Sequence, residues 1–162
     1  MSGRTEDSRR SMAVRRCGRR GTLAAIGALV AAEIAGPAAL AQVTTPQRGA
    51  PLRSAILDAL RPVVERELGG KVEFVVSQMR VQGEWAYVSA QPQRPGGVAI
   101  DWRATKFRKA WDDDMMSDLV LALLRREGNG WKVVEYAIGP TDVAWEDWIK
   151  PHGVSRHLFI DQ

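Results

Sequence analysis

Tryptophan is the residue type through which this sequence most plainly points to binding. Four of the six tryptophans lie outside the segments that read as strands. An indole ring is costly to expose and is favoured at binding hot spots. The pattern therefore predicts an aromatic platform for a glycan, a peptide or a partner protein, formed by Trp102, Trp111, Trp145 and Trp148. The competing interpretation is that these rings close the open end of a sheet as part of the core.

Two carboxylates, Glu135 and Asp101, are the candidates for acid–base chemistry. A carboxyl buried in an apolar pocket between a helix and a curved sheet would have a raised pKa and could act as a base. No second polar partner can be placed from the sequence, and an ordinary exposed charge explains either residue equally simply.

Motifs for other chemistries are weak or missing. Residues 112–114 are three aspartates, with Asp118 nearby, but they lack the alternation of a calcium loop and are expected to form a solvated turn. His152 and His157 have no cysteine or HExxH pattern beside them, so no metal site is expected. Ser89 has no nucleophile elbow around it, and no phosphate-binding or dinucleotide motif is present. The sequence therefore predicts no bound cofactor.

The element that must position these residues is a hairpin over residues 118–139. Asn129-Gly130 is the strongest short-range hairpin signal, because both central residues of a type I′ turn need a positive φ. Pairing outward from that turn places Glu127 opposite Lys132, Leu123 opposite Tyr136 and Leu121 opposite Ile138. One face of the hairpin is then apolar and needs a cover, and it comprises Leu121, Leu123, Val134, Tyr136 and Ile138.

A second hairpin is predicted within residues 71–91, with its turn at Gln82-Gly83. The apolar residues change parity between Val76 and Met79, which indicates a β-bulge. Residues 101–114 read as a long excursion with one helical turn, and a short helix follows Gly139.

Residues 51–68 have the apolar spacing of an amphipathic helix, which Gly69-Gly70 ends. Pro62 predicts a kink there or two helical pieces. The elements together predict an α+β fold in which this N-terminal helix packs on a curved four-stranded antiparallel sheet, followed by a short C-terminal helix. The helix is expected to cover the face that carries Leu121, Leu123 and Tyr136.

The first 41 residues have the pattern of a signal peptide cleaved after Ala41, with Met12 as an alternative start. Arg19-Arg20 leaves both general secretion and twin-arginine export open. Glu33 interrupts the apolar run, so no stable membrane span is expected after cleavage. Residues 42–50 are predicted to form a flexible tether and residues 51–162 a single domain, in the periplasm or secreted.

Removing the leader removes the positive charge. Residues 1–41 hold 7 of the 23 basic and 3 of the 19 acidic residues, which leaves 23 − 7 = 16 basic and 19 − 3 = 16 acidic residues. A mature chain with no net charge lacks the basic face that duplex binding needs, so no nucleic acid partner is expected.

The string Gly139-Pro140-Thr141-Asp142-Val143 with Trp145 and Trp148 resembles a signature of small exported bacterial proteins of unknown function, and residues 122–126 and 129–131 add to the resemblance. The order of elements is similar to cystatin-like and nuclear-transport-factor-like folds. We therefore expect a non-enzymatic exported domain that binds a ligand or protein partner in the bacterial envelope. The alternatives are a small pocket enzyme of the nuclear-transport-factor-like type and an inhibitor or immunity-type protein.

Overall fold

The structure is a computed structural model that describes residues 41–160, so the predicted signal peptide lies outside the described residues except for Ala41. The chain has the α+β architecture that the sequence predicts, with an antiparallel sheet. It runs through α1 (Pro51–Leu68), β1 (Glu73–Gln82), β2 (Trp85–Arg94), β3 (Val98–Ala99), α2 (Arg108–Asp112), β4 (Val120–Glu127), β5 (Gly130–Ile138) and α3 (Glu146–His152), with two 3-10 turns, η1 (Trp102–Ala104) and η2 (Arg156–Leu158).

The sheet has five strands rather than four, because the short β3 folds back onto the end of β2. The main order is β1-β2-β4-β5, which leaves β1 and β5 as its edges. The predicted bulge is confirmed: the register of β1 against β2 shifts between Val76 and Gln78. Helix α1 is assigned as one element with Pro62 inside it, so the expectation of two helical pieces is wrong. Pro62 lies on the exposed side of α1.

Both hairpin turns are centred one residue away from the predicted positions. The turn between β4 and β5 consists of Gly128 and Asn129, since Glu127 pairs with Gly130. Gly128 has a φ of 57° whereas Asn129 has no positive φ, which is the pattern of a type II′ rather than a type I′ turn. The turn between β1 and β2 likewise begins with a glycine at positive φ, Gly83.

The predicted register of the β4–β5 hairpin is wrong for two reasons. The earlier turn pairs Arg125 rather than Glu127 with Lys132. A bulge between Leu123 and Leu124 then shifts the far half by one residue, so that Leu123 faces Glu135. Because side chains alternate along a strand, a shift of one residue moves a set of side chains to the other face. The remaining pairs become Leu121 with Ala137, Ala122 with Tyr136, and Val120 with Ile138.

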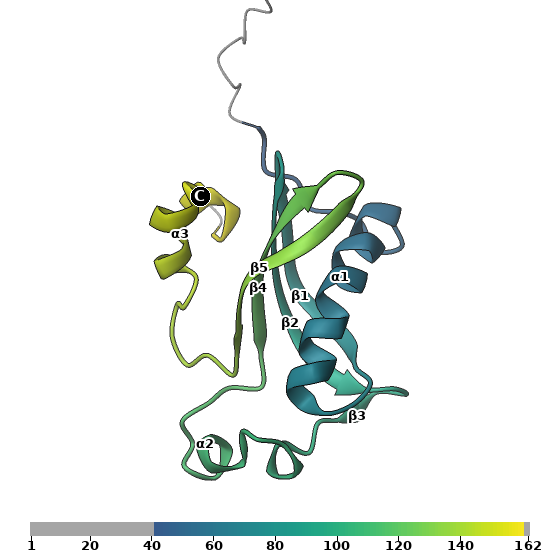
Figure 1. Ribbon diagram of the computed structural model, residues 1–162, viewed down its shortest axis with the longest axis vertical. Coiled ribbons are helices and arrows are strands. Elements are labelled where there is room, and N and C mark those ends of the chain that lie inside the picture. The colour runs from purple at the N-terminus through teal and green to yellow at the C-terminus, as the bar shows by residue number, and fades with distance from the viewer. Residues whose placement is uncertain (1–40, 161–162) are drawn as a thin grey trace, which may run out of the picture. The chain divides into compact units, whose positions relative to one another are not determined.

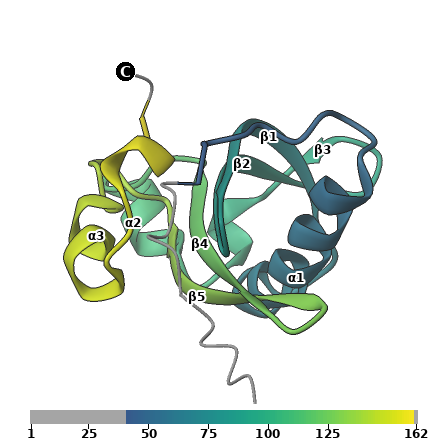
Figure 2. The same cartoon turned by 90° about the horizontal axis from the view of Figure 1, so that it is seen from above.

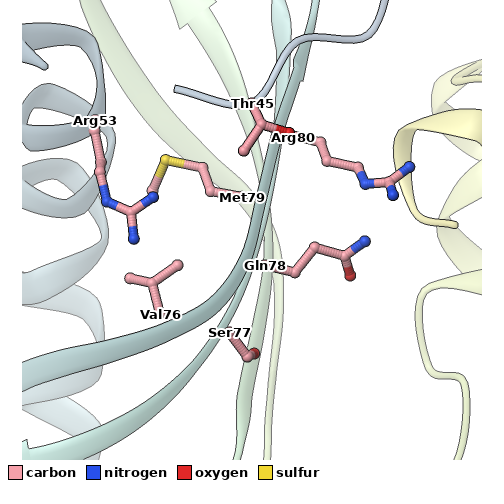
Figure 3. A pocket seen from close by; sticks show the side chains of 7 residues that line it. All are labelled: Thr45, Arg53, Val76, Ser77, Gln78, Met79 and Arg80. Carbon is pink, nitrogen blue, oxygen red and sulfur yellow. The ribbon is translucent and has the colours of Figure 1, made fainter. Parts of the chain in front are cut away.

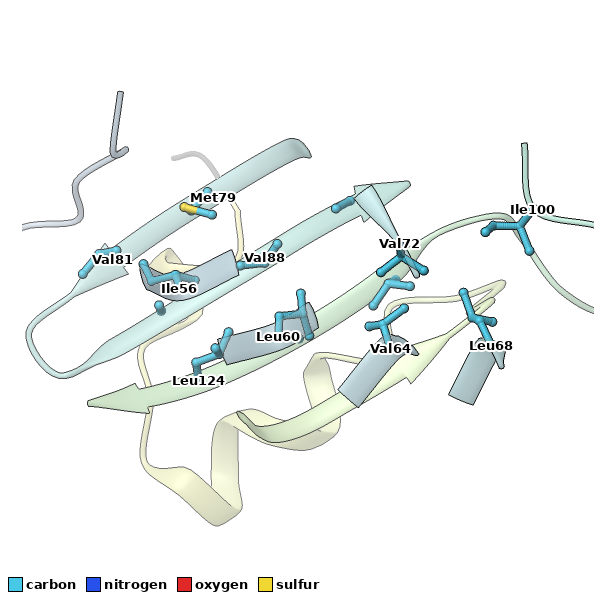
Figure 4. Packing of buried hydrophobic residues seen from close by; sticks show 14 of the residues in the cluster. Ile56, Leu60, Val64, Leu68, Val72, Met79, Val81, Val88, Ile100 and Leu124 are labelled. Carbon is cyan, nitrogen blue, oxygen red and sulfur yellow. The ribbon is translucent and has the colours of Figure 1, made fainter. Parts of the chain in front are cut away.

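Helix α1 packs on the opposite face of β4 from the one predicted. Its apolar stripe meets the strand residues that alternate with Leu121 and Leu123 (Figure 4). The fully buried members of this core are Ile56, Leu60, Val64, Ala86, Val88, Ala90, Val120, Ala122 and Leu124. Tyr136 lies on this side too, where its hydroxyl donates to Glu67 of α1.

The face with Leu121 and Leu123 is covered by the C-terminal segment. Figures 1 and 2 show α1 and α3 on opposite sides of the sheet. Phe159 is at the centre of this second cluster. Its ring stacks on that of Trp145 and meets that of Tyr87 edge-on, and in both pairs the ring centroids are 5.0 Å apart. Burial raises the pKa of Tyr87 to about 12. The sheet is therefore the middle one of three layers.

The glycines of the β4–β5 turn test its geometry. We expect Gly128→Ala to cost about 1–2 kcal/mol, because an alanine at positive φ brings Cβ too close to the backbone. Gly130→Ala is the matched control, since Gly130 has no positive φ and an added Cβ meets nothing closer than 3.9 Å. Chemical denaturation of both variants measures the difference. Equal costs would contradict the assigned turn.

The C-terminal layer is expected to be part of the core rather than a loose cover. Phe159→Ala should lower the free energy of unfolding by about 3–5 kcal/mol, the range for removing a buried aromatic ring. Val143→Ala, at an exposed site in the preceding loop, should change it by less than about 0.5 kcal/mol. A Phe159→Ala variant as stable as the wild type would show that the layer contributes nothing.

Candidate functional site

The four candidate tryptophans do not form one platform. Trp102 of η1 stacks on Trp111 of α2, with their ring centroids 5.6 Å apart. Trp145 and Trp148 instead belong to the cluster around Phe159. Trp102, Trp145 and Trp148 are at most 8% exposed, and Trp111 is half-buried. The stacked pair Trp102 and Trp111 is therefore the only part of the set with a ring open to a ligand.

The two candidate carboxylates lie at separate places. Glu135 is on the face of β5 that turns away from α1, and its Oε1 lies 2.9 Å from His152 Nε2. Asp101 is exposed and accepts a hydrogen bond from the backbone N–H of Arg103, which starts η1. The space between α1 and the sheet is filled by side chains that are 0% exposed, such as Leu60 and Ala122. Neither carboxylate enters that space.

A cavity of about 570 Å³ lies along the outer edge of β1 (Figure 3). Figure 3 shows Arg53, Val76 and Met79 on the α1 side of the strand. Gln78 and Arg80 point to the other side, toward the C-terminal segment. We call this cavity the edge groove, and it is lined by Thr45, Arg53, Val76, Ser77, Gln78, Met79 and Arg80.

The segment before α1 already pairs with this edge at one point. Thr44 and Val81 exchange two backbone hydrogen bonds of 2.8 Å each, and the Thr44 hydroxyl also donates to the Val81 carbonyl. Part of the predicted tether therefore lies on the sheet. Pro46 follows two residues later, and its carbonyl accepts a hydrogen bond from Arg53. The end of the edge groove next to Val81 is thus bounded by the segment before α1.

A second, smaller cavity of about 290 Å³ lies beside the tryptophan pair. We call it the tryptophan groove. Asp118 at its rim accepts a hydrogen bond from the Gln91 amide, so its polar groups partner one another. The other lining residues are Pro92, Gln93, Gly97, Ala99, Ile100, Trp102 and Trp111.

The excursion that carries the tryptophan groove is held to α1 by Glu67. Its carboxylate accepts hydrogen bonds from the ammonium group of Lys106 and from the Tyr136 hydroxyl at 3.0 Å. Lys106 above all, and then Tyr136, hold the pKa of Glu67 below its usual value of 4.5. Within the excursion, the Arg103 guanidinium similarly lowers the pKa of Asp112, whose carboxylate it contacts at 2.7 Å.

Within residues 41–160, no three His, Cys, Asp or Glu side chains lie together in a way that could hold a metal ion. No helix in the described part of the chain is both long and apolar enough to cross a membrane. Comparison with family models, with curated proteins and with solved structures finds no match.

The edge groove was not predicted, although its parts are visible in the sequence. The bulge near Ser77 was predicted, but nothing in the sequence says that β1 is an edge strand. That depends on strand order, since β2 pairs with β4 rather than ending the sheet. The sequence signal for the groove is Pro46. Because proline has no N–H to donate to a ladder, the segment before α1 cannot continue its pairing along the edge of β1.

Replacing Glu67 by Gln should loosen the excursion. We expect amides in residues 105–113 to exchange about two- to fivefold faster, the scale of a partly exposed ion pair. Because the folded-state pKa of Glu67 is lowered, its contribution is complete above pH 4.5 and is lost as the pH falls through the lowered value. Protection factors from hydrogen exchange measure both effects.

Asp58→Asn is the matched control, because Asp58 forms its ion pair with Arg61 on the same helix. Exchange in residues 105–113 that is unchanged by Glu67→Gln, or changed equally by both variants, would contradict this role of Glu67.

Proposed function

We propose that this protein is an exported, non-enzymatic domain that binds a protein partner in the bacterial envelope through the edge groove of β1. The single observation that carries the proposal is the position of the larger cavity, which lies against the open backbone edge of a strand. An exposed strand edge is a ready template for pairing with another chain.

The filling of the sheet's two faces supports binding over catalysis. A pocket enzyme of the nuclear-transport-factor-like type needs a concave pocket with converging polar side chains. Here α1 covers one face and the C-terminal segment covers the other, with core residues such as Leu60 and Leu123 at 0% exposure. The buried side-chain N and O atoms of the described residues all have hydrogen-bond partners.

Export and membership of a group of small envelope proteins remain parts of this proposal. They rest on the signal-like residues 1–41 and on the string from Gly139 to Val143 with its two tryptophans. Those tryptophans, Trp145 and Trp148, have a packing role that would account for their spacing without a ligand.

Site-specific photocrosslinking tests the proposal. A benzophenone amino acid replaces Val75 on β1 or, as a matched control, Val143 in the loop before α3. The two valines are 50% and 51% exposed, so they differ in place rather than in accessibility. We expect irradiation of the expressing bacterium to give a discrete adduct from position 75 that is absent from position 143.

A lack of adducts at position 75, or the same adducts at both positions, would contradict binding at the β1 edge. An adduct that forms only at position 143 would move the interface to the loop before α3.

A further inference from the structure

We infer that the partner supplies an extended, acidic segment, which adds as a strand along β1 between Phe74 and Met79 and places a carboxylate against Arg53. This inference rests on the proposed function, because it names the partner's chemistry at the same edge.

The pairing of β2 shows which backbone groups of β1 point outward. The Arg126 N–H donates to the Glu84 carbonyl, so even-numbered residues of β2 face β4 and odd-numbered ones face β1. The partners of those odd-numbered residues on β1 include Val75, opposite Gln91, and Gln78, opposite Ser89. The β1 residues that lie opposite even-numbered residues of β2 instead turn their backbone N–H and C=O groups to the free edge. These are Phe74, Val76, Met79 and Val81.

Val81 confirms this assignment, because it exchanges both of its backbone bonds with Thr44. In an antiparallel ladder the next pair along would join Pro46 to Met79. Proline has no N–H to donate, so the chain's own strand stops there. The outward N–H and C=O of Met79 therefore begin a row of pairing groups that another chain can use. Ser77 adds no obstacle, since its hydroxyl turns inward to Ser89.

The charge of the edge groove selects the segment. Its charged lining residues are two arginines, with no carboxylate among the lining side chains. Arg80 is buried and donates to the His157 and Ile160 carbonyls of the C-terminal tail. Arg53 makes one hydrogen bond, to the Pro46 carbonyl at 3.3 Å, and its guanidinium has further donors (Figure 3). A carboxylate on the incoming strand would meet those donors in a charge-assisted bond.

A second copy of the chain fits this edge poorly. Antiparallel pairing of two β1 strands would bring two copies of Arg53 to one interface, and like charges there are unfavourable. A partner strand with its own sequence avoids this conflict.

The test uses capped peptides based on acetyl-TVTVTV-amide in which one position carries Glu, scanned along the sequence, and a second set with Lys instead. Binding to the full chain is followed by fluorescence anisotropy of labelled peptides at low salt. We expect the best Glu peptide to bind about tenfold more tightly than its Lys counterpart, the scale of one charge-assisted hydrogen bond. Methylating alternate backbone nitrogens of the peptide should abolish binding, because it removes donors of the added strand.

Arg53→Glu should reverse the preference between the two sets. Arg66→Glu, which makes the same charge change at the far end of α1, should leave it unchanged. Amide exchange at Val76 and Met79 should slow when the peptide is bound. The amide-exchange measurement and the methylated peptide both use the unmutated chain. They therefore test the inference even if a variant is poorly folded.

Equal binding of Glu and Lys peptides, insensitivity to methylation, or protection of amides on β5 instead of β1 would overturn the inference. So would a concentration-dependent dimer of the chain that Arg53→Ala strengthens. A position-75 crosslink without any preference for acidic peptides would remove the acidic segment while leaving the proposed function standing. The absence of that crosslink would remove the proposed function itself.

Discussion

Burial of β4 on both faces is the constraint on which the rest of this structure depends. Its first five residues are all buried, three facing α1 and two facing the C-terminal cluster. A strand with water on neither side needs a cover on each, so the layer with Phe159 is as necessary as α1. Fully burying one such side chain contributes about 1.5–3 kcal/mol, so neither cover can be lost cheaply.

This arrangement moves the open sites to the margins of the sheet. With both faces filled by apolar side chains, the cavities lie along β1 and beside the excursion with Trp102 and Trp111. At a margin the backbone itself is available, and a strand edge recognises an extended chain through main-chain hydrogen bonds. The proposed recognition at the edge of β1 rests on this placement of the cavities.

The sequence was sufficient for the classes of element and for local signals. Glycine pairs, alternation and a change of parity predicted α1, both hairpins and the bulge near Ser77. It was insufficient where one residue decides the outcome. Gly128 competes with Gly130 for the turn, and the bulge at Leu123 has no local signature, so the predicted apolar face mixed residues from two faces. The roles of Trp145 and Trp148 depend on contacts with Phe159 that are long-range and invisible to periodicity.

Native-state hydrogen exchange tests the dependence on β4 most directly. If both covers belong to one cooperative unit, the slowest amides of α1, β4 and α3 exchange with the same opening free energy and the same dependence on denaturant. The account predicts this convergence. Exchange of α3 through a separate, low-energy opening that leaves β4 protected would show that the second face needs no cover, and would contradict the account.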